Sequence, residues 1–303
     1  MSASSNERLY TIGETVQLLQ KTYPDVTHSS LRFLERGGFI RPHRTPGGHR
    51  LFSEADLDRI RTIKQWQEQN LSLEQIGERL ERLDNMPDLQ DLRSRFVDAA
   101  VQGNFIDATQ MIRHADDVGM ASRDIFEGVL TPAMIEIGDR WFAGELDVGR
   151  EHEVSELSRD LISELTLRHI REPEDPFTVL AACVEGEFHE LGLRMVTGLL
   201  RMHGIPVHFL GANVPTDDLA ITVSIRKPDV VLLSATIDAH RPAVGRAIEA
   251  LTKSDRVNPK PAIVVGGQAW HENGLEAGPN VRLLKERSLS AAVDEILSLR
   301  SAP

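Results

Sequence analysis

The chain has 303 residues, enough for two or three domains that each bury a core. Its net charge of −12 argues against nonspecific coating of nucleic acid by the whole surface, although one local basic face is compatible with it. The single cysteine, Cys183, excludes a disulfide framework and a cysteine-ligated zinc site. The first residues lack an apolar signal core and no apolar run approaches transmembrane length, so we expect a cytoplasmic protein without membrane contact.

Two helix-start signals lie near the N-terminus. Thr11 is followed three residues later by Glu14, which predicts a capping box ahead of an amphipathic stretch. A second short helix is expected to begin at Thr27 or His28 and to end at Gly37-Gly38. Two short helices joined by a turn are typical of the helix-turn-helix, whose second helix enters the major groove of DNA.

Residues 41–52 follow these helices and predict a tight hairpin, because Pro and Gly pairs favour a turn there. Its edge is positive through Arg41, Arg44, His49 and Arg50, a charge that suits phosphate. Ser53 is then expected to cap a longer helix. Residues 28–50 hold five arginines and one acid, Glu35, which stands out in an acidic chain.

The segments YTIGE, LRFLERGGFI, RTPGGHRLFSEADLDRI and LSLEQI resemble the DNA-binding domain of the MerR family over about residues 9–80. The resemblance implies a winged helix-turn-helix bound to double-stranded operator DNA. It also implies a role for particular side chains. Those expected at the major groove are Ser29, Ser30 and Arg32, and those expected at phosphate or the minor groove are Arg44, His49 and Arg50.

The middle of the chain predicts a four-helix bundle. Asn85-Met86-Pro87 marks a linker, and helical periodicity then runs through residues 88–170. Breaks are expected at Gly103-Asn104, Val118-Gly119 and Ala143-Gly144, which leaves four helices joined by short loops. The apolar stripes expected to face the core are Phe96, Val97, Ala100 and Val101; Ala108, Met111, Ile112 and Ala115; Ile125, Val129, Ile135 and Ile137; and Leu157, Leu161, Leu165 and Leu167.

Trp141 is expected to end one helix of the bundle, and Glu151-His152 to open the next. Taken from spacing alone, Trp141 can be ordinary core and Glu151 an acid favoured by the helix dipole. The same positions can also present a flat indole and two polar groups to a ligand. The residues themselves leave both interpretations open.

The C-terminal part changes to alternating strands and helices. Short apolar runs at 177–184, 206–210, 230–234, 262–265 and 281–283 predict strands, and helical stretches lie between the first four and after the last. This alternation predicts a doubly wound parallel sheet, in which ligands bind beyond the carboxyl ends of the strands. The polar and glycine residues expected at that edge are His189, Gly211-Ala212-Asn213, Ser234 and Gly266-Gly267.

Each of these positions has a chemical interpretation. His189 can ligate a metal through one ring nitrogen while Glu187 holds the other. Gly192 and Gly266-Gly267 let a bulky group approach the backbone, and Ser234 can donate to a buried heterocycle. The set resembles the cobalamin-binding domain of methionine synthase and the adenosylcobalamin mutases, with Glu187 in place of an aspartate and Thr236 in place of a leucine. The resemblance implies a corrinoid whose cobalt takes His189 as its axial ligand.

The three parts in this order resemble the CarH/LitR type of MerR-family photoreceptor repressors. We therefore predict a DNA-binding domain at 1–84, a four-helix cobalamin cap at 85–172 and a Rossmann-like cobalamin domain at 173–303. The resemblance implies a non-enzymatic repressor with adenosylcobalamin held between cap and sheet, where Trp141, Glu151 and His152 contact the upper side. It also implies tetramers that hold operator DNA in the dark and dissociate when light breaks the cobalt–carbon bond.

The chain departs from that family at Phe142, because light-sensing members commonly place a histidine beside the tryptophan. Phenylalanine cannot ligate cobalt, which excludes a bis-histidine product through this position. Two alternatives stay open on the sequence. One is a MerR-type regulator that senses a different cobalamin or another tetrapyrrole, and the other is a corrinoid carrier subunit of a methyltransferase or mutase.

Overall fold

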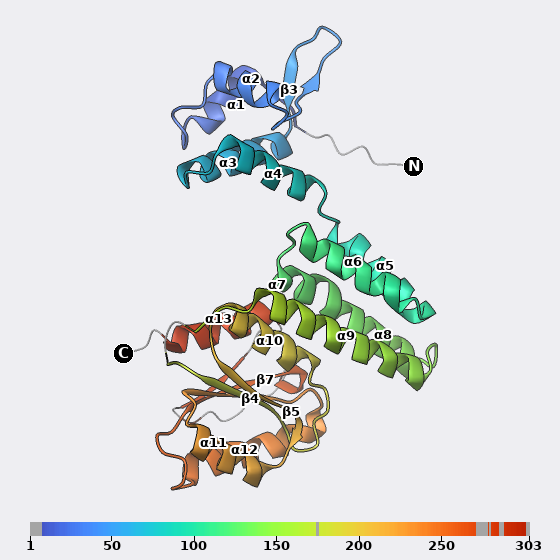
Figure 1. Cartoon of the computed structure of the whole chain (residues 1–303), viewed down its shortest axis with the longest axis vertical. Helices are drawn as coiled ribbons and strands as arrows, with labels where there is room; N and C mark the ends of the chain where they lie inside the picture. The colour runs from blue at the N-terminus through green and yellow to red at the C-terminus, as the bar shows by residue number, and fades with distance from the viewer. Residues whose placement is uncertain (1–7, 174–175, 271–277, 279, 285–287, 301–303) are drawn as a thin grey trace. The chain divides into compact units, whose positions relative to one another are not determined.

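A computed structural model describes residues 8–173, 176–270, 278, 280–284 and 288–300. The chain divides into two compact units, with the boundary between Met86 and Pro87 (Figure 1). The bundle and the α/β part therefore lie in one compact unit, whereas the N-terminal part forms its own. None of the described helices is long and apolar enough to cross a membrane.

The first unit is a small helical domain with a three-stranded antiparallel sheet of order β1-β3-β2. Its elements are β1 (Tyr10–Thr11), α1 (Ile12–Leu19), α2 (His28–Arg36), β2 (His43–Arg44), β3 (Arg50–Phe52), α3 (Glu54–Glu68) and α4 (Leu73–Asp84). Side-chain caps at Thr11, Thr27, Ser53 and Ser72 begin the four helices, so the predicted capping box at Thr11–Glu14 is confirmed. The expected helix pair and hairpin are both present.

The second unit opens with the four-helix bundle. Its elements are α5 (Leu89–Gln102), α6 (Phe105–Asp117), the continuous run α7 (Ser122–Ile125), η1 (a π-helical turn, Phe126–Leu130) and α8 (Thr131–Phe142), and α9 (Val148–His169). The predicted helix breaks are confirmed. Two predicted core positions are wrong, since the side chains of Ile135 and Leu167 lie on the outer surfaces of their helices and are 48% and 72% exposed.

The α/β part holds five parallel strands in the order β5-β4-β6-β7-β8. Its elements are β4 (Val179–Val184), α10 (Leu191–Met202), β5 (Val207–Val214), α11 (Thr216–Arg226), β6 (Val230–Ser234), the 3-10 turn η2 (Asp238–His240), α12 (Arg241–Lys253), β7 (Ala262–Gly266), the 3-10 turn η3 (Gln268–Trp270), β8 (Val281–Leu283) and α13 (Leu289–Arg300). Helices α11 and α12 cover one face of the sheet, and α10 and α13 cover the other, where α10 also packs on α9 (Figure 1).

The strand order places a topological switch point between β4 and β6. From β4 the chain moves outward to β5 and then returns to β6 on the other side of β4. At such a point the two connections leave in opposite directions, which opens a crevice beyond the carboxyl ends of both strands. Ligands of doubly wound sheets bind in this crevice, so a ligand site is expected at the loops after β4 and β6.

One predicted strand end is wrong. The sequence placed Gly211-Ala212-Asn213 beyond the end of the second strand, but β5 continues through them to Val214. Gly211 and Asn213 both have positive φ, and the pairing of β4 with β5 shifts register in this stretch. An irregular backbone lets the ladder continue past residues that are usually found in turns.

Glu127, in the π-helical turn, ties the bundle to the last helix of the sheet layer. Its carboxylate accepts hydrogen bonds from the Ser288 hydroxyl and from the Ser290 hydroxyl and N–H, each at 2.8 Å. Burial alone would raise the pKa of Glu127, but the hydrogen bonds from Ser290 and Ser288 outweigh it and hold the pKa below its ordinary value.

Glu127→Gln is expected to lower the free energy of unfolding at pH 7 by about 1–2 kcal/mol, as loss of a helix cap does. Because the folded pKa is depressed, this stabilisation is present above the ordinary pKa of glutamate, about 4.3, and is lost as the pH falls below it. Urea unfolding of variant and parent at pH 7 and pH 4 should show the difference shrinking. Glu136→Gln, which removes a surface pair with Arg140 on α8, should change little at either pH. Equal stability of the Glu127 variant and the parent at pH 7 would contradict the role of Glu127.

Candidate functional site

The most unusual side chain at the switch point is Glu187, a completely buried carboxylate three residues beyond the end of β4. Its Oε1 accepts hydrogen bonds from the His189 backbone N–H at 2.9 Å and from His189 Nδ1 at 2.6 Å. The ring of His189 is therefore held by the nitrogen nearer to the backbone. The predicted pairing of these two residues is confirmed in its geometry.

The other carboxylate oxygen of Glu187 reaches across to the loop after β6. Its Oε2 accepts from the Thr236 N–H at 2.6 Å, the Ile237 N–H at 3.3 Å and His240 Nδ1 at 2.9 Å. Burial alone would raise the pKa of Glu187, but hydrogen bonds from His189, His240 and the backbone outweigh it and keep the group ionised at neutral pH. One carboxylate thus joins the two loops that border the crevice.

His189 presents its Nε2 edge outward, because Nδ1 is held by Glu187. The His189 side chain is 58% exposed, while that of Glu187 is fully buried. The hydrogen bond from Glu187 raises the pKa of His189, and burial only partly offsets this. A carboxylate behind an imidazole fixes its tautomer and orientation and makes its free nitrogen a stronger donor to a metal.

The donor set indicates what kind of metal fits. No group of three or more His, Cys, Asp or Glu side chains suited to a metal ion occurs among the described residues. Cys183, whose Sγ lies 3.8 Å from the His189 carbonyl oxygen, does not help, because burial raises the pKa of its thiol to about 12. A single oriented imidazole suits a metal that brings its other ligands with it, as the macrocycle of a corrinoid or haem does.

The glycines predicted to admit a ligand differ in their surroundings. Gly192 lies in the first turn of α10 next to open space, where a bulky group has room to approach. Gly267 has φ +105°, and a Cβ there would lie 2.1 Å from the carbonyl oxygen of Ala235. The predicted reason for Gly267, close approach of a ligand, is therefore incomplete, because the packing of two loop backbones already requires a glycine. A Cβ on Gly266 would meet Leu284 at 3.0 Å.

Two predicted positions follow β6. Ser234 is the last residue of β6, is buried, and pairs with Cys183 on β4 and Gly266 on β7. Thr236 contributes its backbone N–H to Glu187, which is a role that does not depend on the side chain. Threonine and leucine would both supply this N–H.

The bundle supplies the residues predicted for the other side of the ligand. Trp141 and Phe142 end α8 with exposed rings, at 46% and 88%, so neither is ordinary core. Glu151, in the first turn of α9, accepts from the Ser155 hydroxyl at 2.9 Å and pairs with His152 Nδ1 at 2.9 Å. The charge of Glu151 also contributes to the raised pKa of His189, so it lies within electrostatic range of the site.

The sequence did not point to His240 or to Arg159. His240 ends a 3-10 turn after β6 and reaches Glu187 only through tertiary structure. Arg159 of α9 donates from Nε to Glu190 Oε1 at 2.9 Å, next to His189 in the chain. Neither residue belongs to a recognisable spacing. A buried acid with two flanking histidines is a signal that only the fold reveals.

The predicted DNA-binding residues lie in the first unit. Ser29 and Arg32 are exposed on α2, whereas the Ser30 hydroxyl is part of the helix cap and bonds to Thr27. Two arginines of the hairpin, Arg44 and Arg50 (the wing arginines), both pair with Glu35, the only acid in residues 28–50. Arg44 Nη2 and Arg50 Nε each lie 2.5 Å from a carboxylate oxygen of Glu35. His49 is exposed at the hairpin tip.

Glu35 thus joins the hairpin of β2 and β3 to α2. Burial alone would raise the pKa of Glu35, but the hydrogen bonds from Arg50 and Arg44 outweigh it and hold the pKa below its ordinary value. Glu35→Gln is expected to weaken sequence-specific DNA binding about tenfold, because two released arginines must each be ordered again on binding at about 0.5–1.5 kcal/mol. Anisotropy titrations with specific and random duplexes measure this.

The control for Glu35 is Glu78→Gln, which removes the same charge from an exposed position on α4. If charge alone matters, both variants will bind DNA slightly more tightly than the parent. Only the ordering role of Glu35 predicts a loss confined to the Glu35 variant and to specific DNA.

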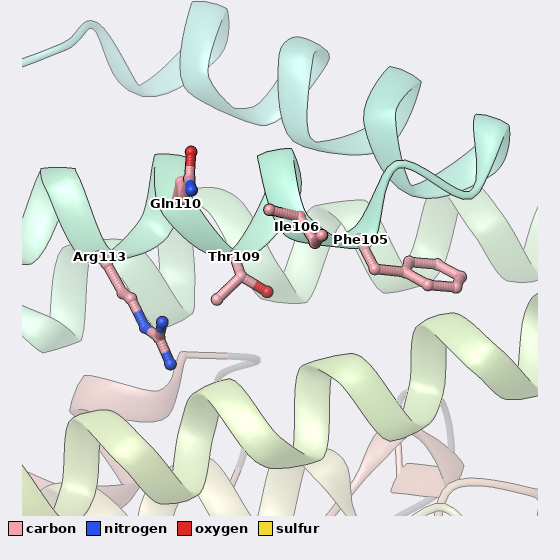
Figure 2. Close-up of a pocket in the computed structure, with 5 residues that line it drawn as sticks. All are labelled: Phe105, Ile106, Thr109, Gln110 and Arg113. Carbon is pink, nitrogen blue, oxygen red and sulfur yellow. The ribbon is translucent and has the colours of Figure 1, made fainter.

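A separate hollow lies on the bundle. Figure 2 shows its lining residues along α6, namely Phe105, Ile106, Thr109, Gln110 and Arg113. The volume of the hollow is about 230 Å³. Arg113 Nε and Nη2 form a two-point pair with Glu164 of α9 at 2.8 and 2.7 Å. None of the residues predicted to bind a cofactor lines this hollow.

Comparison with protein families matches all three parts of the chain. The model described as MerR HTH family regulatory protein matches residues 10–83. Two models described as B12 binding domain match residues 92–166 and 177–277. The bundle and the sheet that carries Glu187 and His189 are therefore each similar to a B12-binding domain.

Two repressors are similar to this chain over about two thirds of its length. The HTH-type transcriptional repressor CarH of Myxococcus xanthus is 29% identical over 66% of this chain and 71% of its own length. The repressor CarA of the same organism is 32% identical over 69% of this chain and 72% of its own length. The solved monomethylamine corrinoid protein of Methanosarcina barkeri shares the fold of the second unit, with a TM-score of 0.60, 18% identity and coverage of 71% of this chain and all of that one.

Proposed function

Because the chain belongs to the MerR family, in the group with B12-binding domains that includes CarH and CarA, we propose that it is a cobalamin-dependent transcriptional repressor. The observation that carries the proposal is the Glu187–His189 pair at the switch point, in a chain that also has a winged helix-turn-helix. A ligand can control DNA binding only if it prefers one state of the protein, and a chain that carries both sites meets the first requirement for such coupling.

In this proposal the ligand is adenosylcobalamin and His189 Nε2 is the axial ligand of its cobalt. Glu187 orients His189 from behind, and Gly192 leaves room for the macrocycle beside α10. Ser234, Thr236, Gly266 and Gly267 border the crevice that takes the nucleotide tail. Trp141, Glu151 and His152 contact the upper side from the bundle. The polar pair at Glu151 and the exposed indole of Trp141 supply complementary surfaces for an adenosyl group.

Cofactor binding is proposed to stabilise a tetramer that holds operator DNA through Ser29, Ser30, Arg32, Arg44, His49 and Arg50. Adenosylcobalamin supplies a cobalt–carbon bond that visible light cleaves, so that light would release the adenosyl group and the operator. Phe142 has no atom that ligates a metal, so the illuminated state must be held without it. A different cobalamin or another tetrapyrrole as the signal is the alternative that Phe142 favours.

The test combines DNA binding with size measurement on the purified full chain. With adenosylcobalamin in the dark, we expect the protein to retard duplex DNA from its gene's own promoter in a gel and to form tetramers. After illumination we expect the retardation to be lost and the tetramers to dissociate. A shift that responds to methylcobalamin or haem but not to adenosylcobalamin would favour the alternative. Gel retardation of the DNA that is independent of both cofactor and light would overturn the proposal. Methyl transfer to a thiol acceptor would indicate a corrinoid carrier.

A further inference from the structure

The solvent face of α2 combines cationic side chains with one aromatic ring. Ser29, Arg32, Phe33 and Arg36 are all exposed and recur at helical spacing, within an arc of about 100° at 3.6 residues per turn. Leu31 and Leu34 lie on the opposite side of the helix and are buried. The face toward solvent is therefore defined by residues 29, 32, 33 and 36.

Phe33 is the unusual member of this face. Its side chain is 47% exposed, although the core of the same unit buries comparable groups such as Phe52 completely. An exposed phenylalanine leaves apolar area in water, at a cost of about 25 cal/mol for each Å² that stays unburied. A single exposed apolar residue is common on protein surfaces, so its exposure alone carries no conclusion. Its surroundings decide what it can contact.

Those surroundings are strongly positive. Arg32 and Arg36 flank Phe33 on the helix and are both exposed. The only acid between residues 28 and 50, Glu35, has its charge balanced by Arg44 and Arg50. A second copy of this face would be repelled, and an apolar protein surface would leave the cations without partners. The surface fits a partner that offers many negative charges and a small apolar group between them.

The major groove of DNA meets both requirements. Its walls carry phosphates, and the C5-methyl of thymine is the apolar group that base edges present there. We propose that Phe33 contacts a thymine methyl in the major groove and so selects thymine at one position of the operator. The inference rests on the DNA binding proposed above. It adds a specificity residue that hydrogen-bond patterns would not reveal, because phenylalanine has no polar atom.

The experiment removes one methyl at a time. Full-length protein with adenosylcobalamin, kept in the dark, selects binding sites from a randomised duplex library, and each thymine of the selected site is then replaced singly by deoxyuridine, which lacks only that methyl. One replacement is expected to weaken binding of the parent protein about fourfold, as loss of one buried methyl does. The same replacement should have no effect on Phe33→Ala, whose selected sites should also lose the preference for thymine there.

Leu73→Ala is the matched control, since Leu73 is an exposed apolar side chain on another helix of the same unit. The Leu73→Ala variant should lose as much affinity on deoxyuridine replacement as the parent does. The proposal is overturned if no replacement affects the parent, or if the Phe33 variant responds as the parent does. Failure to select any DNA would overturn DNA binding itself, whereas selection of a site without methyl dependence would overturn only the role of Phe33.

Discussion

Replacing His189 by alanine is expected to weaken binding of adenosylcobalamin by at least about 10–100-fold, the range found when only an outer partner of a metal ligand is removed. The reason is geometric. Glu187 holds Nδ1 at 2.6 Å, so Nε2 is the only ring nitrogen that His189 can offer a metal. With alanine the cobalt would lose a protein nitrogen on that side, and its visible absorption bands should shift. Absorption titration measures both effects.

Added imidazole makes this prediction sharper. The alanine variant leaves a space of the size of the lost ring, so free imidazole should restore much of the parent spectrum. His203→Ala is the control, because His203 lies at the opposite end of α10 and bonds to the Leu199 carbonyl. An unchanged spectrum and affinity in the His189 variant would refute its role as axial ligand. A shift in the His203 variant would show that the spectrum reports folding rather than ligation.

Glu187→Gln is expected to lower the free energy of unfolding by about 3–5 kcal/mol even without cofactor, as removal of one partner from a buried charged cluster does. The Glu187 carboxylate accepts from two histidines and three backbone N–H groups, and it is fully buried. An amide keeps one acceptor oxygen but turns two N–H donors toward groups that also donate. Urea unfolding at pH 7 measures the loss.

Glu185→Gln provides the comparison for Glu187. Glu185 is two residues away, half exposed, and pairs with Arg246 at 3.4 Å, so its replacement should cost at most about 1 kcal/mol. If the Glu187 variant proves no less stable than the Glu185 variant, the carboxylate does not join the two loops as its hydrogen bonds indicate. The Glu187 variant should also bind cobalamin more weakly, because His189 loses its orientation.

Local chemistry made several elements predictable. The Thr11 and Ser53 caps begin helices because their hydroxyls satisfy backbone N–H groups within three residues, which needs no tertiary contact. The strands at 230–234 and 262–265 were found because both of their faces are buried and their apolar runs are unbroken. The same reasoning failed at Ile135 and Leu167, since a periodic pattern does not say how wide the buried stripe is.

The site was predictable only in part. The spacing of Glu187, His189 and Gly192 and the resemblance that it carries identified one side of the crevice. His240 and Arg159 were missed, because they act on Glu187 and Glu190 from 53 and 31 residues away in the chain. The position of Phe33 was not predictable either. Its residue type suggests core, and only the burial of Leu31 and Leu34 on the other side of α2 shows that it faces outward.

By itself the sequence determined the order of the three parts, the parallel sheet and the imidazole at its edge. These features depend on the periodicity of apolar residues, on turn residues and on motifs, each of which can be recognised within a short stretch of chain. The tertiary structure decided that the Glu187 carboxylate is buried and ionised, that it joins the loops after β4 and β6, and that the wing arginines close on Glu35. Burial and charge pairing arise only when distant segments meet, because desolvation and Coulomb attraction depend on distance in space.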